Sequence, residues 1–186
     1  MSTLEIRRAG PEDASSIAEV HSRSFRSSYA HLPVTRRSAE TGLEGRVVVW
    51  DERLRGSDRT TLVALGDDRV VGFVHLGQSP DDDADATTGH VFSVHVDPDL
   101  TGRGIGGQLV MAATTALASD GYRAATLWVL AENERARRFY QRLGWEGDGS
   151  VRTEILSVGS EDGDEVEVVR LHLDLEGTVE GARENS

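Results

Sequence analysis

The residues from Val96 to Leu109 read VDPDLTGRGIGGQL and decide the fold of this chain. They follow an apolar run typical of a strand, residues 90–96, and precede a helical pattern that ends at Asp120-Gly121. Four glycines within residues 102–107 let successive backbone N–H groups converge at the start of this helix, where the helix dipole favours an anion. The sequence therefore predicts a phosphate site here, to which Arg103 can add a charge-assisted hydrogen bond.

The glycine spacing leaves two other interpretations. Gly102-x-Gly104-x-x-Gly107 also fits the fingerprint of dinucleotide-binding folds. That motif leaves its strand almost directly and is followed by an acid at the end of the next strand. Here residues 97–101 intervene, and no acid follows the next strand before Glu132, so a nicotinamide cofactor is disfavoured. A glycine-rich turn without any ligand is the remaining alternative.

The rest of the chain alternates between strand and helix patterns. A β-hairpin is predicted around Gly66-Asp67-Asp68, and Pro11 and Asn133 are expected near the starts of helices. Strands are predicted at residues 4–8, 60–65, 69–76, 90–96, 124–130, 151–158 and 165–173, and helices at 10–32, 34–55, 105–119 and 133–143. This order predicts a single mixed α/β or α+β domain over residues 1–176, followed by a flexible polar tail at 177–186.

Composition and charge limit the class of protein. The 186 residues include no cysteine, which excludes disulfide frameworks, thiolate metal sites and cysteine nucleophiles. The net charge of −12 disfavours nucleic acids and anionic membranes as partners. The six histidines show no spacing typical of metal ligands, so no metal is expected. No apolar run is long enough to cross a membrane and the start has no signal-peptide core, so we expect a soluble cytoplasmic protein.

Two motifs in this order resemble those of the GNAT superfamily of acyl-CoA-dependent N-acetyltransferases. The family's pyrophosphate motif, Gln/Arg-x-x-Gly-x-Gly/Ala after a strand ending in Val-x-Pro, is similar to the segment from Val96 to Gly106. The second motif, Asn-x-x-Ala-x-x-x-Tyr-x-x-x-Gly-Phe/Trp, is similar to Asn133 to Trp145. Thr101 stands where Gln or Arg is usual, so weaker phosphate capture is expected. The resemblance implies a GNAT fold, with a central, mixed, mostly antiparallel seven-stranded sheet and about four flanking helices.

The resemblance also implies where acetyl-CoA, the expected cosubstrate, would bind. Backbone groups of Val94, His95 and Val96 would contact the pantetheine arm and the thioester carbonyl. Asn133 would contact the cofactor near this arm, cap its helix, or do both. The residues expected to hold the pyrophosphate are Gly102, Arg103, Gly104, Ile105, Gly106 and Gly107.

Acetyl transfer to an amine needs a proton donor for the departing thiolate and an acceptor for the amine proton. Tyr140 matches the family's usual general acid, and the alternative is a core tyrosine, because it shares a helix face with Phe139 and Leu143. Counting back from Val96 puts His90 where many members carry a catalytic Glu, and the alternative is a structural strand histidine. The other candidates for the base are His75, His95 and Glu132.

The sequence thus predicts an N-acetyltransferase that moves an acetyl group from acetyl-CoA to a primary amine by direct attack in a ternary complex. The net charge and the acidic loop from Asp81 to Asp85 favour a small cationic acceptor. The alternatives are acetylation of a protein N-terminus and a non-catalytic acyl-CoA-binding module. The resemblance also implies that a homodimer can form through the last strands.

Overall fold

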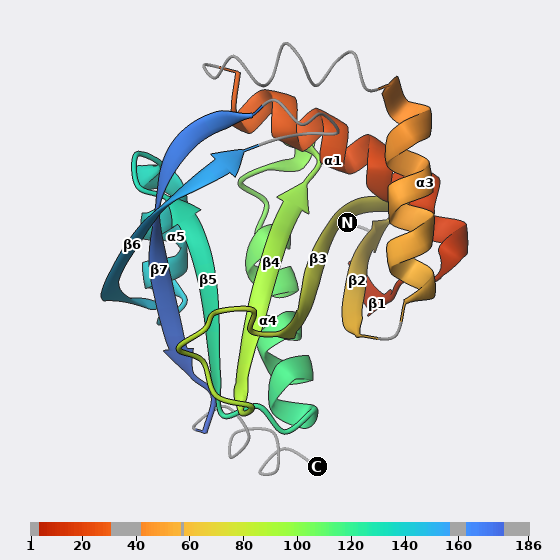
Figure 1. Cartoon of the computed structure of the whole chain (residues 1–186). Helices are drawn as coiled ribbons and strands as arrows, with labels where there is room; N and C mark the ends of the chain where they lie inside the picture. Colours follow the sequence, from red (N-terminus) through yellow and green to blue (C-terminus); the bar gives the residue numbers. More distant parts are fainter. Residues whose placement is uncertain (1–3, 31–41, 57, 157–162, 177–186) are drawn as a thin grey trace.

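A seven-stranded sheet in the order β1-β2-β3-β4-β5-β7-β6 forms the centre of the molecule (Figure 1). The computed structural model describes residues 4–30, 42–56, 58–156 and 163–176, so the predicted tail and residues 31–41 lie outside the described part. The strands are β1 (Glu5–Arg8), β2 (Arg59–Gly66), β3 (Arg69–Gln78), β4 (Thr88–Val96), β5 (Ala124–Leu130), β6 (Glu146–Leu156) and β7 (Asp164–Asp174). The helices are α1 (Ala14–Ser28), α3 (Gly42–Arg55), α4 (Ile105–Ser119) and α5 (Glu134–Arg142), with short 3₁₀ helices η1 (Pro11–Asp13) and η2 (Pro98–Leu100).

The described residues confirm the predicted mixed, mostly antiparallel sheet and contain four α-helices that flank it, in line with the prediction of about four. Among the described strands only β4 and β5 pair in parallel. The dinucleotide-binding alternative is therefore wrong, because that fold needs a series of parallel strands. The predicted hairpin is confirmed at Asp67 and Asp68, whose φ angles of 50° and 59° suit a two-residue turn. β6 begins at Glu146, earlier than predicted, because its ladder with β7 continues beyond a bulge between Gly147 and Val151.

Helices cover both faces of the sheet, and the side chains of β3 divide between two cores. Val71 and Val74 pack in one core with α4, whereas Val70 and Phe73 pack in a second core with α1 and α3. Residues three apart share a core here because the ladder between β2 and β3 is irregular at Val71. Figure 1 shows α4 behind β3 and β4, and α3 beside β2. Trp50 of α3, only 2% exposed, anchors the second core. The two helix layers therefore lie on opposite sides of the strands that carry the candidate site.

The parallel pair of strands separates along its length. β4 pairs with β5 only from Thr88 to His90, whose partner is Thr126. On its other side, β4 pairs with β3 across a bulge, because Leu76 opposes Val91 and His75 opposes Ser93, leaving Phe92 as the extra residue. From residue 91 onward the backbone groups of β4 that face β5 are outside the ladder between these two strands. The sheet thus opens at the place where the sequence motifs predict the site.

Candidate functional site

A cavity of about 1000 Å³ occupies the opening between β4 and β5. Its walls come from residues 91–96 of β4, residues 127–129 of β5, the start of α4, α5, and one face each of α1 and α3. It therefore joins the two helix layers through the gap in the sheet. The predicted site residues that line it are Val94, His95, Val96, Gly102, Gly104, Ile105, Gly106, Gly107, Asn133 and Tyr140.

The start of α4 has the backbone geometry of an anion site. Gly102 and Gly104 have φ angles of 80° and 83°, in the left-handed region that favours glycine. A Cβ atom at Gly102, Gly104 or Gly107 would meet no atom within 4 Å, so a ligand can approach the backbone closely here. Gly104 is the N-cap and provides no side-chain hydrogen bond, so the first N–H groups of α4 remain available to an anion. Arg103 is exposed and is not among the residues that line the cavity.

A short polar turn fixes this loop against α1. Asp97, 2% exposed, accepts hydrogen bonds from the Asp99 backbone N–H at 3.1 Å and from Arg23 of α1 at 2.6 Å. The Thr101 hydroxyl donates to the Pro98 carbonyl at 2.9 Å. The Thr101 side chain therefore ends η2 with a local hydrogen bond, and the residue also lines the cavity.

Two predicted residues of α5 lie on the cavity wall. The Asn133 side chain accepts a hydrogen bond from the Ala136 N–H at 3.0 Å, which confirms the predicted helix cap, and the residue also lines the cavity. Tyr140 is half-buried and lines the cavity, and its hydroxyl forms no hydrogen bond with the described residues. Burial, together with the nearby Tyr29, raises the pKa of Tyr140 above its usual value near 10. Its hydroxyl therefore stays protonated over the physiological pH range.

Of the four candidates for the base, the structure brings only His95 to the cavity. His90 is 5% exposed, its Nδ1 lies 2.8 Å from the Thr126 hydroxyl, and it does not line the cavity. His75 is 3% exposed and contacts the Thr61 hydroxyl, and Glu132 is exposed on the surface. His95 is half-buried, and its Nδ1 lies 3.1 Å from the Ser24 hydroxyl. Burial lowers the pKa of His90 and of His95 to about 4, so both rings are neutral at pH 7.

A cluster of aromatic side chains from α1 and α3, which the motifs did not predict, completes the wall beside His95. The His21 ring lies 4.7 Å from the His95 ring, centroid to centroid, and its Nδ1 accepts a hydrogen bond from the Trp50 indole at 3.3 Å. Burial, then the charges of His95 and the nearby arginines, lowers the pKa of His21 to about 2. His21 is therefore a neutral side chain whose Nδ1 is already engaged.

Arginines supply all the charge of the described cavity lining. Arg46 and Arg53 come from α3, and Arg135 and Arg142 come from α5, whereas no Asp or Glu of the described ranges lines the cavity. The sequence carries a signal for the α3 pair: Arg46, Trp50 and Arg53 are four and three residues apart, which places them on one helix face. The sequence predicts only a helix for this segment, because the spacing of these three residues indicates a binding surface only once the facing elements are known.

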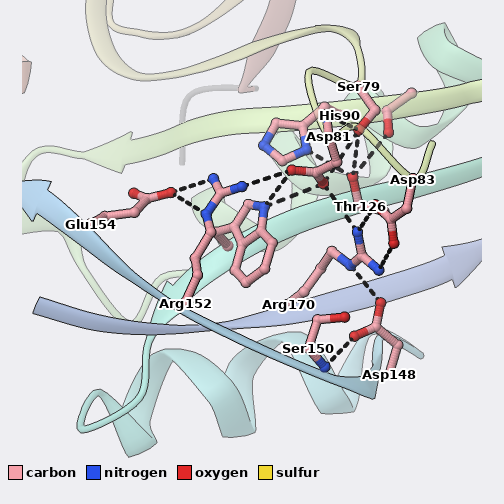
Figure 2. A network of polar contacts seen from close by, with 12 residues as sticks. Ser79, Asp81, Asp83, His90, Thr126, Asp148, Ser150, Arg152, Glu154 and Arg170 are labelled. Carbon is pink, nitrogen blue, oxygen red and sulfur yellow. Dashed lines mark hydrogen bonds and ion pairs between the residues drawn. The ribbon is translucent and has the colours of Figure 1, made fainter.

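The acidic loop before β4 is engaged elsewhere (Figure 2). Asp81 is 8% exposed and accepts hydrogen bonds from the Trp128 indole at 3.0 Å and from Arg152 of β6 at 2.9 Å. Arg170 of β7 binds Asp83 through two hydrogen bonds of 2.6 Å. The loop is therefore not a freely solvated connector at Asp81, as its polar sequence alone would suggest. Nor do these carboxylates line the cavity, so they give no support for a cationic acceptor.

The described ranges contain no cluster of three or more His, Cys, Asp or Glu side chains arranged to hold a metal ion. Nor do they contain a helix with the length and apolar character needed to span a membrane.

The fold and the cavity together define the class of protein. A sheet that opens between its two parallel strands, above a glycine-capped helix start, has the architecture of an acetyltransferase. The family model described as the Acetyltransferase (GNAT) family matches residues 15–145, and the chain belongs to this family.

Individual relatives agree with this assignment. Mycothiol acetyltransferase from Actinosynnema mirum is 35% identical over 114 residues, which are 56% of this chain and 37% of that protein. The chain thus spans well under half the length of this relative. An N-acetyltransferase from Staphylococcus aureus shares the fold with a TM-score of 0.72 at 22% identity, covering 94% of this chain and all of the other. The paia N-acetyltransferase from Thermoplasma acidophilum, solved in complex with coenzyme A, gives 0.68 at 19% identity, covering 92% and 99%.

Proposed function

We propose that this protein transfers the acetyl group of acetyl-CoA to a primary amine on a small molecule, by direct attack in a ternary complex. The observation that carries the proposal is the cavity itself, because it connects the glycine-capped start of α4 with Tyr140 and His95. A phosphate site, a proton donor and a neutral imidazole are thus reached from one continuous space. The absence of cysteine excludes an acyl-enzyme on a thiol and so supports direct attack.

The two ends of acetyl-CoA have different surroundings in this proposal. The pyrophosphate binds the N–H groups of residues 102–107 at the start of α4, where the helix dipole favours negative charge. The pantetheine arm lies between β4 and β5, against the backbone of Val94 to Val96 that β5 does not pair with. Arg135 and Arg142, which line the cavity from α5, add positive charge for a cosubstrate that carries several negative charges.

Tyr140 is the proton donor in this proposal. Its raised pKa keeps the hydroxyl protonated, and the hydroxyl makes no competing hydrogen bond with the described residues. The thiolate that leaves the tetrahedral intermediate belongs to a thiol with a pKa of about 8.5, below that of the phenol, so it first accepts a strong hydrogen bond from Tyr140. The hydroxyl thus stabilises the negative charge that develops on the sulfur and can pass its proton to it.

His95, in place of His90, is the proton acceptor that the geometry favours. An imidazole whose pKa is lowered to about 4 by burial is too weak a base to deprotonate a free ammonium ion. The amine nitrogen becomes strongly acidic, however, once it is bonded to the carbonyl carbon, and a neutral imidazole is then basic enough to take its proton. In the tautomer that donates Nδ1–H to the Ser24 hydroxyl, 3.1 Å away, Nε2 is available as the acceptor.

The test of the proposal is release of free thiol from acetyl-CoA in the presence of a panel of amines that includes short peptides. The chain has no cysteine, so the protein itself contributes no thiol background. We expect release that depends on a small-molecule amine. Binding of acetyl-CoA without release would contradict the enzyme proposal and favour a binding module, and release with peptides alone would contradict the small-molecule acceptor.

A matched pair of variants tests the assignment of the base. We expect His95→Gln to lower kcat at least tenfold and His90→Gln to leave it within about twofold, because only His95 lines the cavity. The reverse order would return the role to His90.

The predicted homodimer is a separate proposal, supported by the exposed Val151 and Ile155 on the edge strand β6, and light scattering tests it.

A further inference from the structure

The charges on the cavity wall, more than the net charge of the chain, indicate which acceptor the protein binds. The chain has a net charge of −12, yet every charged side chain of the described cavity lining is an arginine. Net charge determines the field far from the protein, whereas binding of a small molecule depends on groups within a few ångströms. The acceptor is therefore selected by the wall of the cavity.

Two of these arginines, Arg46 and Arg53, lie far from the predicted phosphate site. Both are on α3, which packs with α1 against one face of the sheet, whereas the glycine loop opens α4 on the other face. Trp50, between them on the same helix face, belongs to the α1 and α3 core and contacts His21. His21 in turn contacts His95 of β4. The pair thus lies on the side of the cavity from which an acceptor would reach His95.

The surroundings of Arg53 favour an anion. Its guanidinium stacks over the Trp50 ring at 5.1 Å, and no carboxylate of the described ranges forms an ion pair with it. Arg53 is on the exposed edge of the cavity, where partial burial and the charge of Arg59 lower its pKa, and no described carboxylate neutralises it. Arg46, which also lines the cavity, is 8% exposed, and burial together with Arg26 lowers its pKa as well. A bound anion would stabilise the Arg53 guanidinium, and a bound cation would be repelled by both arginines.

We infer that the acceptor is an amine that also carries an anionic group, a carboxylate or a phosphate, and that Arg53 of α3 binds this group, with Arg46 adding positive charge to the same wall. The inference rests on the proposed acetyltransferase function and names the chemical class of its acceptor. With the anionic group on α3, the amine of a short molecule points toward His95 and the thioester. The positive wall also disfavours the ammonium form of the amine, which helps the neutral nucleophile to form.

Matched pairs of amines test this inference directly. Thiol release from acetyl-CoA is measured with glycine against glycinamide, phenylalanine against phenylalaninamide, and phosphoethanolamine against ethanolamine. Rates are compared per concentration of neutral amine, because amidation also changes the basicity of the amine. We expect kcat/KM to be at least about tenfold higher for the anionic member of a pair, the effect of one charge-assisted contact. The pair that shows the preference identifies carboxylate or phosphate as the anionic group.

Variants of α3 separate this contact from general damage. Arg53→Gln should raise KM for the anionic amine about tenfold and leave the values for its uncharged counterpart within twofold, while Arg53→Lys keeps part of the preference. Arg55→Gln is the control, because Arg55 is on the same helix but is paired with the exposed Asp51 and lies outside the cavity lining. Equal melting temperatures and acetyl-CoA affinities verify that each variant is folded.

The outcomes distinguish this inference from the proposed function. Thiol release with equal or better rates for uncharged amines, or equal effects of Arg53→Gln and Arg55→Gln, overturns the inference and leaves the acetyltransferase proposal in place. If no amine gives release, the proposed function fails, and calorimetry then decides the inference by comparing N-acetylglycine with N-acetylglycinamide on the CoA-loaded protein. Tighter binding of the carboxylate supports the anion site, and equal binding overturns it.

Discussion

Arg170 and Arg53 carry the same guanidinium group in opposite surroundings. Arg170, on β7, donates hydrogen bonds to Asp83 and Asp148 and lies 3.5 Å from Asp81, so the chain itself supplies its counter-charge (Figure 2). Arg53 lines the cavity without a carboxylate partner in the described ranges. The pKa of Arg170 is raised, chiefly by its hydrogen bond with Asp83, whereas burial lowers the pKa of Arg53.

The difference bears on the prediction of a cationic acceptor, which rested on the net charge and on the acidic loop from Asp81 to Asp85. The acidic loop that seemed to favour a cationic molecule is engaged by Arg152 and Arg170, which join it to the last two strands. The arginines that line the cavity, in contrast, share its wall with no Asp or Glu of the described ranges. The function of a charged side chain is therefore read from its partners: a compensated arginine holds segments together, and an uncompensated one in a cavity is available to a ligand.

The largest expected effect compares the stability of two variants. Arg170→Met removes the cation that joins three carboxylates, one of which, Asp81, has a side chain only 3% exposed. We expect the free energy of unfolding to fall by about 2 kcal/mol, since the partly buried side chain of Asp148 loses its counter-charge and the buried Asp81 keeps only Arg152. Arg53→Met should change it by less than about 0.5 kcal/mol, because the methionine still packs on Trp50. Urea denaturation measures both, and equal losses would remove the distinction between the two arginines.

A second prediction concerns a cavity residue that acts on turnover and contributes little to stability. Tyr140→Phe keeps the ring contacts with Phe139 and Trp145 and removes only the hydroxyl, which has no described hydrogen-bond partner. We expect kcat to fall about 100-fold, the lower end of the contribution of a general acid. Acetyl-CoA affinity and melting temperature should stay near those of the parent. A kcat within twofold of the parent would make Tyr140 a core residue.

Local patterns predicted most of the fold. The hairpin at Asp67 and Asp68, the helix cap at Asn133 and the glycine start of α4 each depend on residues close in sequence, and the structure has all three. The extra length of β6 was missed, because its first residues pair with β7 across a bulge, in a segment whose glycines and Asp148 lack a strand pattern. Features that depend on residues close in sequence were therefore predictable, whereas the start of β6, which depends on pairing with β7, was not.

The same limit applies to the site. Motifs placed the glycine loop, Asn133 and Tyr140, all of which line the cavity. They could not separate His90 from His95, because the bulge at residue 92 and the splay of β4 decide which histidine reaches the opening. Nor could they show that Asp83 pairs with Arg170, which is 87 residues away. From the sequence alone, the negative charge of the loop was therefore counted as available to a ligand, although Arg170 neutralises part of it in the fold.

A third prediction uses pH to separate the buried histidines from the ion-pair network. Burial lowers the pKa of His75 and His90 to about 4, so between pH 6.5 and 4 these histidines are protonated in the unfolded chain but neutral in the folded chain. As the pH falls through this range, the free energy of unfolding should decrease by roughly 1 kcal/mol per pH unit for each such histidine. The pKa values of Asp83 and Asp148 are lowered instead, chiefly by hydrogen bonds with Arg170 and with the Ser150 backbone, so their stabilisation is lost only below about pH 4.

Unfolding in urea at several pH values measures these two windows. His90→Gln removes one titrating ring, so the slope of the unfolding free energy against pH should decrease between pH 6.5 and 4 and stay unchanged below pH 4. The slope is the readout, because the variant is also expected to lose the contact between His90 and the Thr126 hydroxyl. An unchanged slope between pH 6.5 and 4 would show that His90 takes up its proton equally in the folded and the unfolded protein, which contradicts a lowered pKa.

The smallest expected effect belongs to an arginine that is compensated but exposed. Arg55 donates two hydrogen bonds to Asp51 one helical turn away, at 2.8 and 2.9 Å, and its side chain is 64% exposed. Arg55→Gln should leave the melting temperature almost unchanged, and added salt should abolish any small loss, because water and ions screen the pair. Thermal unfolding at low and high salt measures it. A loss as large as that of Arg170→Met would mean that pairing alone, without burial, determines what an arginine contributes here.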